Sequence, residues 1–296
     1  MHVRSRYDLL LTASAFLACI VGPGTTSAQD KITRDQVSFR AATALDPGAE
    51  VKGELRIPET GRDRVPAVLV LHTAAGIDAT GASYIEVLNR AGVATLEIEM
   101  FPNRASLPKT TRVVMPHTFG SLLYLASHPR IDPQRIGVIG FSYGGILSLR
   151  AASDEVAREY AGGKAKFAAH IALYPVCWIH SAILAGKNKV YGAETYRRVT
   201  GAPVHILTGE WDDYDDADTC PKFVAALPEE ARGRVGATVY PRAYHAFDQP
   251  GADGQYDDII AHKGAGGRVR RLEHPEAAKK ARRFTVEFFQ THFGVK

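Results

Sequence analysis

Cysteine is scarce in this chain, and it does not occur in the pattern of a metal site. The 296 residues include three cysteines, Cys19, Cys177 and Cys220. No pair of cysteines or histidines has the short spacing that structural zinc sites use. The sequence therefore predicts no metal ion and no other cofactor.

A strong excess of charge of one sign is missing as well. The net charge is +4 at pH 7, and the first 28 residues contribute two arginines and one aspartate to it. The balance is too small to predict a nucleic-acid partner. A basic cluster is expected in a glycine-rich loop and is interpreted as solvated surface. Its members are Lys263, Arg268, Arg270 and Arg271.

The N-terminal apolar stretch is too short to span a bilayer, so no permanent membrane span is expected. Arg4 and Arg6 precede this stretch at residues 9–21, and Thr26-Ser27-Ala28 has the small residues of a cleavage site. We expect a signal peptide over residues 1–28, cleaved after Ala28, and a periplasmic or secreted bacterial protein. A lipoprotein signal at Cys19 is the alternative.

Export would permit a disulfide between Cys177 and Cys220. Both cysteines are expected just past the carboxyl ends of neighbouring strands. Two buried free thiols are the alternative, and the sequence does not favour either state.

Residues 29–296 contain no internal repeats, and strand and helix patterns alternate along them. This alternation predicts a single α/β domain with a mainly parallel central sheet and helices on both faces. The predicted strands are 51–57, 66–72, 93–100, 135–141, 167–174, 203–209 and 236–240. The predicted helices are 84–91, 110–127 and 275–289.

The motif Gly140-Phe141-Ser142-Tyr143-Gly144-Gly145 stands between an apolar strand and a helical pattern. This context is typical of a nucleophile elbow, in which a strained turn lifts the serine hydroxyl above the sheet. The turn is so tight that side chains at Gly140 or Gly144 would collide with their surroundings. Ser142 is therefore the candidate nucleophile.

A serine hydroxyl needs a base to accept its proton and an acid to orient that base. In this fold the acid and the histidine follow the serine, in that order, beyond later strands. Position favours Asp212 as the acid, with Asp213 as its rival, and His245 as the base. A calcium loop or a solvated helix N-terminus would also account for the many aspartates of residues 210–218.

The oxyanion of the reaction needs two fixed N–H donors. The elbow offers the N–H of Tyr143, and the loop after the strand at residues 66–72 offers that of Ala74. His72 is interpreted as a brace of that loop.

With these residues in place, the chain resembles the dienelactone hydrolase family of the α/β-hydrolase superfamily over about residues 51–293. Three segments carry the resemblance, and they are residues 132–145, 209–213 and 240–248. The resemblance implies an α/β-hydrolase fold, Ser142 as nucleophile, Asp212 as acid and His245 as base. It also implies a small-molecule ester or lactone as substrate.

The chain departs from the founding enzymes of that family at the nucleophile and in the pocket. Those enzymes have a cysteine nucleophile, a glutamate where this chain has Thr73, and two arginines that hold a substrate carboxylate. Arg104 matches one of these arginines, and Gln249 stands in the place of the other. Thr73, Arg104 and Trp178 are the candidate substrate-binding residues, and an ion-paired surface residue is the alternative for Arg104.

The sequence thus predicts an exported serine hydrolase that cleaves carboxylic esters or lactones through a Ser-His-Asp triad. The alternatives are a serine peptidase of the same superfamily and a catalytically silent binding protein with this fold. The acyl and alcohol groups of the substrate and the oligomeric state are not predicted.

Overall fold

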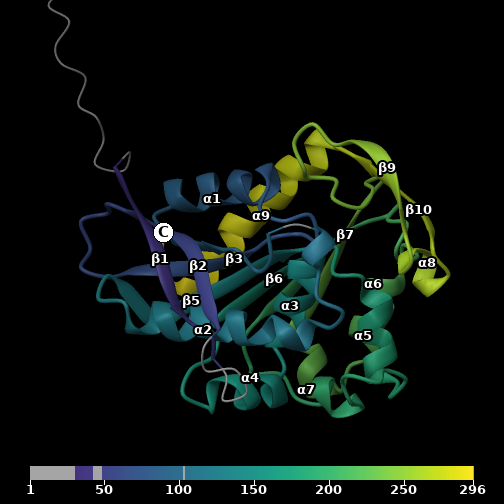
Figure 1. Cartoon of the computed structure of the whole chain (residues 1–296), viewed down its shortest axis with the longest axis horizontal. Helices are drawn as coiled ribbons and strands as arrows, with labels where there is room; N and C mark the ends of the chain where they lie inside the picture. Colours follow the sequence, from purple (N-terminus) through teal and green to yellow (C-terminus); the bar gives the residue numbers. More distant parts are fainter. Residues whose placement is uncertain (1–30, 43–48, 103, 296) are drawn as a thin grey trace, which may run out of the picture.

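A computed structural model of the chain describes residues 31–42, 49–102 and 104–295. The predicted signal peptide, residues 1–28, lies outside the described residues. A twisted sheet of eight strands forms the centre, with strand order β1-β2-β4-β3-β5-β6-β7-β8 (Figure 1). Its strands are β1 (Ile32–Arg40), β2 (Glu50–Pro58), β3 (Val65–Leu71), β4 (Ala94–Ile98), β5 (Ile131–Phe141), β6 (Ala169–Leu173), β7 (Val204–Gly209) and β8 (Val235–Tyr240).

The sheet is mainly parallel, as predicted. Strands β4, β3, β5, β6, β7 and β8 pair in parallel, whereas β1 pairs with β2, and β2 with β4, in antiparallel fashion. All residues of β3, β4 and β6 are buried, because helices cover both faces there. The carboxyl ends of the parallel strands therefore meet at one edge, where connecting loops can gather.

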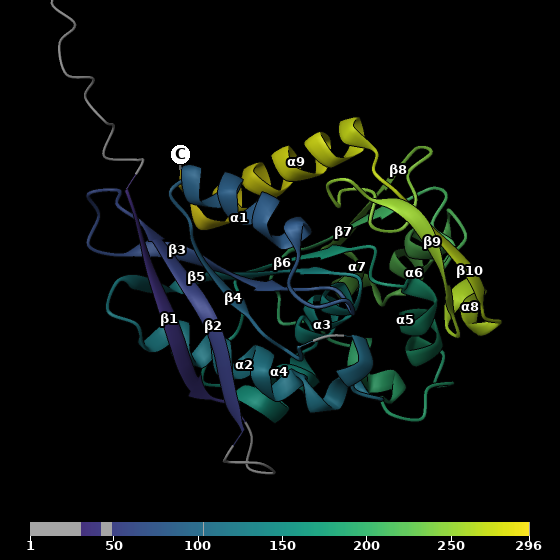
Figure 2. The same ribbon diagram turned by 45° about the horizontal axis from the view of Figure 1, so that its top comes forward.

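Helices lie in two layers, one on each face of the sheet (Figure 2). Helices α1 (Ala79–Arg90) and α9 (Pro275–Phe293) lie side by side on one face. The other face is covered mainly by α2 (Met115–Ser127), α3 (Tyr143–Ala151), α4 (Asp154–Ala161), α5 (Cys177–Leu184), α6 (Thr219–Ala226) and α7 (Glu229–Arg232). None of the helices in the described residues is long and apolar enough to cross a membrane.

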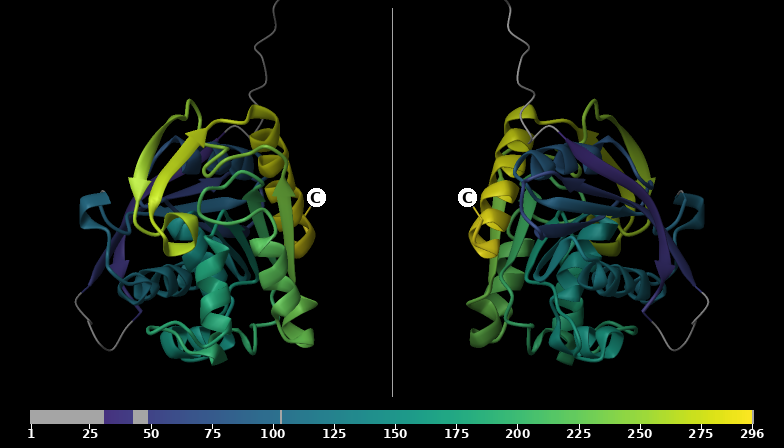
Figure 3. Two further views of the ribbon diagram at one scale, coloured as in Figure 1. Left: turned by 90° about the vertical axis from the view of Figure 1, so that its right-hand side faces the viewer. Right: turned by 90° about the vertical axis from the view of Figure 1, so that its left-hand side faces the viewer.

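A two-stranded hairpin stands apart from the main sheet. It comprises β9 (Asp253–Asp258) and β10 (Gly267–Leu272), joined through the short helix α8 (Ala261–Gly264). Figure 3 shows this hairpin packed across one end of the molecule, above α5. The basic residues Arg268, Arg270 and Arg271 thus lie on a strand, which corrects their interpretation as a loop.

The expected helix at residues 110–127 is interrupted. A 3-10 turn, η3 (Thr111–Val113), precedes α2, and Pro116 stands in the first turn of that helix. Proline lacks an N–H and fits only the start of a helix, so α2 begins there and not at Thr110. Two further 3-10 turns, η2 (Arg104–Ser106) and η4 (Ala193–Tyr196), lie in loops.

One carboxyl group is buried within the sheet. Glu97, on β4, is 5% exposed, and its Oε1 has no hydrogen-bond partner among the described residues. Burial raises the pKa of Glu97 from 4.5 to about 7, while Arg56 opposes this shift. Folding therefore favours the protonated form of this carboxyl group. The free energy of unfolding should fall as the pH rises from about 4.5 to about 7, because the carboxyl group of the unfolded chain ionises in this range while the buried one still holds its proton.

Replacing Glu97 by glutamine tests this assignment. Glu97→Gln should raise the melting temperature at pH 8, where the parent carries a buried charge, and the gain should shrink at pH 5. The shift corresponds to about 3 kcal/mol of unfolding free energy between the two limits. Thermal melts followed by circular dichroism measure it, with Glu99→Gln, at an exposed neighbouring position, as the control. An equal gain at both pH values would contradict the assignment.

Candidate active site

Ser142 lies on the turn between β5 and α3 with a backbone conformation that side chains rarely adopt. Its φ is 51° and its ψ is −108°, a strained combination for a residue other than glycine. A Cβ atom added at Gly140 would lie 2.0 Å from the carbonyl oxygen of Gly144, and one at Gly144 would lie 2.1 Å from that of Leu71. The structure thus shows the collisions that the motif predicted, so both glycines are required for the turn.

The structure brings Ser142, His245 and Asp212 together from three loops. The Nε2 atom of His245 lies 2.9 Å from Ser142 Oγ, and its Nδ1 atom lies 2.9 Å from Asp212 Oδ2. Because a carboxylate only accepts, Nδ1 carries the proton and Nε2 is free to accept from the serine hydroxyl. His245 and Asp212 are 2% and 3% exposed, so little water competes for these bonds.

The rival acid, Asp213, is directed elsewhere. Its Oδ2 accepts the backbone N–H of Arg270, on β10, at 2.8 Å. The neighbouring carboxylates are held by separate donors of the protein: Asp215 by two backbone N–H groups, Asp216 by Lys263 and Asp218 by Lys222. These aspartates are therefore not arranged around a common centre, as a calcium loop would require.

Tyrosine rings enclose the base on two sides. The ring centroids of Tyr174 and Tyr214 lie 4.9 and 4.4 Å from that of His245. Tyr174 also donates its hydroxyl to Asp248 at 2.7 Å, and Tyr84 donates to the same carboxyl group at 2.6 Å. Asp248 is fully buried, and burial raises its pKa. The sequence analysis did not predict these hydrogen bonds to Asp248, although Asp248 stands in the same segment as His245.

The two expected oxyanion donors line one cavity with the nucleophile. Tyr143 is the first residue of α3, so its N–H has no acceptor within the helix. Ala74, on the loop after β3, lines the same cavity. His72 braces this loop: its Nε2 accepts the N–H of Met100 at 3.0 Å, so its Nδ1 donates to the carbonyl of Thr73 at 2.7 Å.

The cavity has a volume of about 770 Å³ and extends from Ser142 toward the hairpin. Of the candidate substrate-binding residues, Thr73 and Arg104 line it. Arg104 is ion-paired with Asp258 at 2.6 Å and lies over the ring of Tyr256. Its positive charge is thus already matched by a carboxylate of the protein.

Trp178 was the third candidate substrate-binding residue. Trp178 lies outside the residues that form the cavity wall and packs in a small cluster with Ile260 near Gly264. It is the second residue of α5, and its ring lies beside Gly264 of α8. The direction of a helical side chain depends on its position along the helix, and the sequence did not reveal where α5 begins.

Two arginines that the sequence did not single out for binding also line the cavity. Arg271, on β10, donates to Gln249 at 3.1 Å and so brings a cation to the position where the founding enzymes have arginine. Arg150, on α3, is 4% exposed; it donates to Thr111 and lies 4.3 Å over the ring of Tyr191. Among the described residues no carboxylate forms an ion pair with Arg150, and its Nε has no hydrogen-bond partner.

Cys177 and Cys220 form a disulfide between α5 and α6. With Asp215 they also form a group whose candidate ligand atoms lie within 4.8 Å of one another. Because both sulfur atoms are bonded to each other, this group has no thiolate to offer a metal ion.

Comparison with known families identifies the family of the chain. The family model described as the dienelactone hydrolase family matches residues 51–293. The chain belongs to the dienelactone hydrolase family. The match includes the elbow, the acid loop and the histidine loop, and it confirms the resemblance and the α/β-hydrolase fold. As a member of this family, the protein is a hydrolase that acts on esters.

Solved structures share the fold of this dienelactone hydrolase family member at low sequence identity. Dienelactone hydrolase from Anabaena variabilis is 19% identical, with a TM-score of 0.57, over 88% of this chain and 98% of that one. Esterase 2 from Thermogutta terrifontis, phosphorylated by paraoxon, is 16% identical, with a TM-score of 0.62, over 86% and 94%. A dienelactone hydrolase-like promiscuous phosphotriesterase from metagenomic libraries is 19% identical, with a TM-score of 0.59, over 89% and 99%. No curated protein matches the chain.

The crowding at the elbow of this family member leads to a test. Gly144→Ala would force a Cβ against the backbone of β3, so the turn must shift, at a cost of about 3 kcal/mol. We expect a lower melting temperature and loss of ester hydrolysis. Gly233→Ala is the matched control, since its φ is −64° and its nearest neighbour would lie at an ordinary 3.7 Å. Full activity in Gly144→Ala would show that the turn is not constrained.

Proposed function

We propose that this protein is an exported serine hydrolase that cleaves carboxylic esters or lactones through an acyl-enzyme and without a cofactor. The observation that supports the proposal most is the imidazole of His245, within 2.9 Å of both the Ser142 hydroxyl and the Asp212 carboxylate. Family membership supplies the ester as the class of substrate.

In the proposed mechanism, Ser142 Oγ attacks the ester carbonyl while Nε2 of His245 takes the hydroxyl proton. Asp212 accepts from Nδ1, keeps the imidazole in the productive tautomer and stabilises the imidazolium that forms. The N–H groups of Tyr143 and Ala74 hold the oxyanion. His245 then returns the proton to the leaving alcohol, and an activated water molecule releases the acyl group by the same steps.

Two observations support export. The basic and apolar leader ends in small residues at Ala28. The Cys177–Cys220 disulfide suits an oxidising compartment such as the periplasm or the outside of the cell. N-terminal sequencing of the exported protein should begin at Gln29, and an intact Met1 would contradict this part of the proposal.

Removing the nucleophile tests the reaction itself. Ser142→Ala should lower the turnover of p-nitrophenyl acetate by about 10⁴-fold or more, because the remaining groups only bind and polarise the ester. A fluorophosphonate should label Ser142 in the wild type, as the paraoxon-treated Thermogutta terrifontis esterase is phosphorylated. Absence of labelling would favour a silent binding protein, and preferred cleavage of peptide amides would favour a peptidase.

Arg150, at the cavity wall, supports a preference for substrates whose acyl group also carries a carboxylate at its far end. A buried guanidinium without an ionic partner is costly, and a substrate carboxylate would supply that partner. Arg150 is in this state, whereas Arg104 is already paired with Asp258.

A pair of matched esters tests this preference. The mono-p-nitrophenyl ester of adipic acid carries a free carboxylate. Methyl p-nitrophenyl adipate, in which that carboxylate is a methyl ester, is neutral. The wild type should have the higher kcat/KM for the anionic ester, and Arg150→Met should reduce that preference by about 10- to 100-fold. Arg150→Lys, which keeps a charge, should retain part of it. The same preference in Arg150→Met as in the wild type would exclude Arg150 from substrate binding.

A further inference from the structure

The acid of the triad lies on a loop in which Tyr214 is the one buried hydrophobic side chain. Residues 210–218 connect β7 to α6, and Trp211, Asp216 and Asp218 are exposed. Asp212 must nevertheless remain within hydrogen-bond reach of a histidine on another loop. A displacement of about 1 Å at such a contact can cost about 100-fold in rate. The loop therefore needs a fastening outside the triad.

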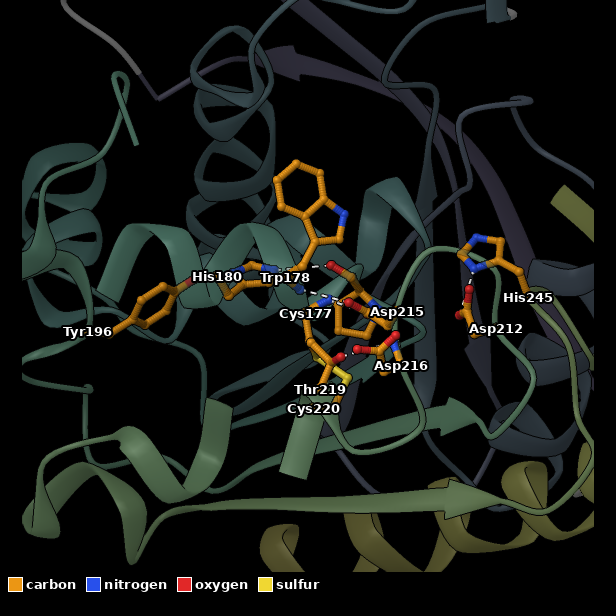
Figure 4. Close-up of a disulfide and its surroundings, with 11 residues drawn as sticks. Cys177, Trp178, His180, Tyr196, Asp212, Asp215, Asp216, Thr219, Cys220 and His245 are labelled. Atoms are coloured by element: carbon orange, nitrogen blue, oxygen red, sulfur yellow. Dashed lines mark hydrogen bonds and ion pairs between the residues drawn. A yellow bond between two sulfur atoms is a disulfide. The ribbon is translucent and has the colours of Figure 1, made fainter. Parts of the chain in front are cut away.

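Asp215, three residues after Asp212, supplies a two-pronged contact to α5. Its Oδ2 accepts the backbone N–H of Cys177 at 2.6 Å, and its Oδ1 accepts that of Trp178 at 2.8 Å (Figure 4). These N–H groups are at the positive N-terminal end of the eight-residue helix α5. Because both carboxylate oxygens are engaged, the contact fixes the orientation of the loop as well as its position.

The disulfide fastens the same loop at its far end. Cys177, whose N–H is bound by Asp215, is also bonded through its sulfur to Cys220, the second residue of α6. Figure 4 shows the disulfide and the Asp215 carboxylate on the same end of α5. The first residue of α5 is therefore a common anchor for two points of the chain that follow Asp212.

The segment that leads into α5 also lies against His245. Tyr174, which precedes α5, has its ring 4.9 Å from that of His245. Tyr174 and Val176 have positive φ angles of 37° and 56°, which surrounding contacts must maintain. An anchor at Cys177 thus holds the loop of Asp212 to the same segment that contacts His245.

We propose that Asp215 is a positioning residue for Asp212, and that the Cys177–Cys220 disulfide is the second fastening of the same loop. This inference rests on the proposed serine hydrolase function and names residues that act through Asp212, without contact with the substrate.

The charge state of Asp215 gives the contact a pH dependence. Burial and then the negative charge of Asp212 raise the pKa of Asp215 to about 7, against the effect of the two N–H groups and His245. The charged groups that act on Asp215 are thus Asp212 and, when protonated, His245, and the disulfide sulfurs lie close to its carboxylate. Above about pH 7 the carboxylate is ionised and holds α5 most strongly.

Asp215→Asn tests the role, because asparagine retains the shape but not the charge. At pH 8.5 we expect kcat for p-nitrophenyl acetate to fall by about 10- to 100-fold, with KM changed less than about threefold. The ratio of wild-type to variant kcat should shrink at pH 6, where the wild-type carboxyl group is also neutral. Asp216→Asn, at an exposed carboxylate of the same loop, should match the wild type at both pH values.

If Asp215 only caps α5 and has no influence on the triad, the result should differ. Asp215→Asn would then melt at a lower temperature but would keep the kcat and the fluorophosphonate labelling rate of the wild type at 20 °C. That outcome would overturn the proposal. An inactive, unlabelled wild type would instead overturn the serine hydrolase function on which it rests.

Reduction of the disulfide is the second measurement, and it requires no substitution. A dithiol such as dithiothreitol transfers two electrons and two protons to the disulfide, which yields two cysteine thiols and the oxidised, cyclic reductant. Reduced wild type, with the two thiols counted by mass spectrometry after alkylation, should have a severalfold lower kcat. In reduced Asp215→Asn the loss should exceed the product of the separate losses, because each fastening compensates for the other.

Independent effects, or an unchanged kcat in the reduced wild type, would contradict a shared role. If Asp215→Asn does not fold, the reduced wild type decides alone: a severalfold loss of kcat without a change in KM supports the proposal, and full activity overturns it.

Discussion

The site depends on one imidazole that bonds at the same time to a hydroxyl and to a carboxylate from different loops. His245 can do so only if three loop ends keep their relative positions to within fractions of an ångström, since hydrogen bonds weaken steeply with distance and angle. The parallel sheet provides this frame, because β5, β7 and β8 end at the same edge. Everything else around the site limits the movement of those three ends.

Close backbone contacts limit the movement of Ser142. Ser142 remains in a strained conformation because the glycines around it let α3 pack against β3 and β5 without intervening side chains. The same packing places the N–H of Tyr143 at the start of a helix and free of intrahelical bonds. The strain, the close approach and the proposed oxyanion donor therefore all arise from a single turn.

Buried carboxyl groups recur around the site and in the sheet, and each has a different consequence. Asp212 is matched by the imidazole, and Asp248 by two tyrosine hydroxyls. Glu97 has an oxygen with no such partner, and burial raises its pKa to about 7. Donors favour the ionised form of a buried carboxyl group, burial favours the protonated form, and the balance of the two differs from one group to the next.

The sequence alone determined the fold class and the place of the elbow, and it predicted the order of the proposed nucleophile, acid and base. These features are encoded locally, in the alternation of strands and helices and in the spacing of small residues around Ser142. The strand β1 and the hairpin of β9 and β10 were not predicted, because much of their surface is exposed and polar residues fill it. An apolar pattern is the signal that such strands lack.

Only the tertiary structure decided which way the side chains on the loops face. It directs Asp212 to the base and Asp213 to β10, pairs Arg104 with Asp258, and brings Arg150 to the cavity. Adjacent aspartates are equivalent in the sequence, and an arginine carries no sign of its partner. The direction of each is set by donors, acceptors and packing that the chain supplies from tens to more than a hundred residues away.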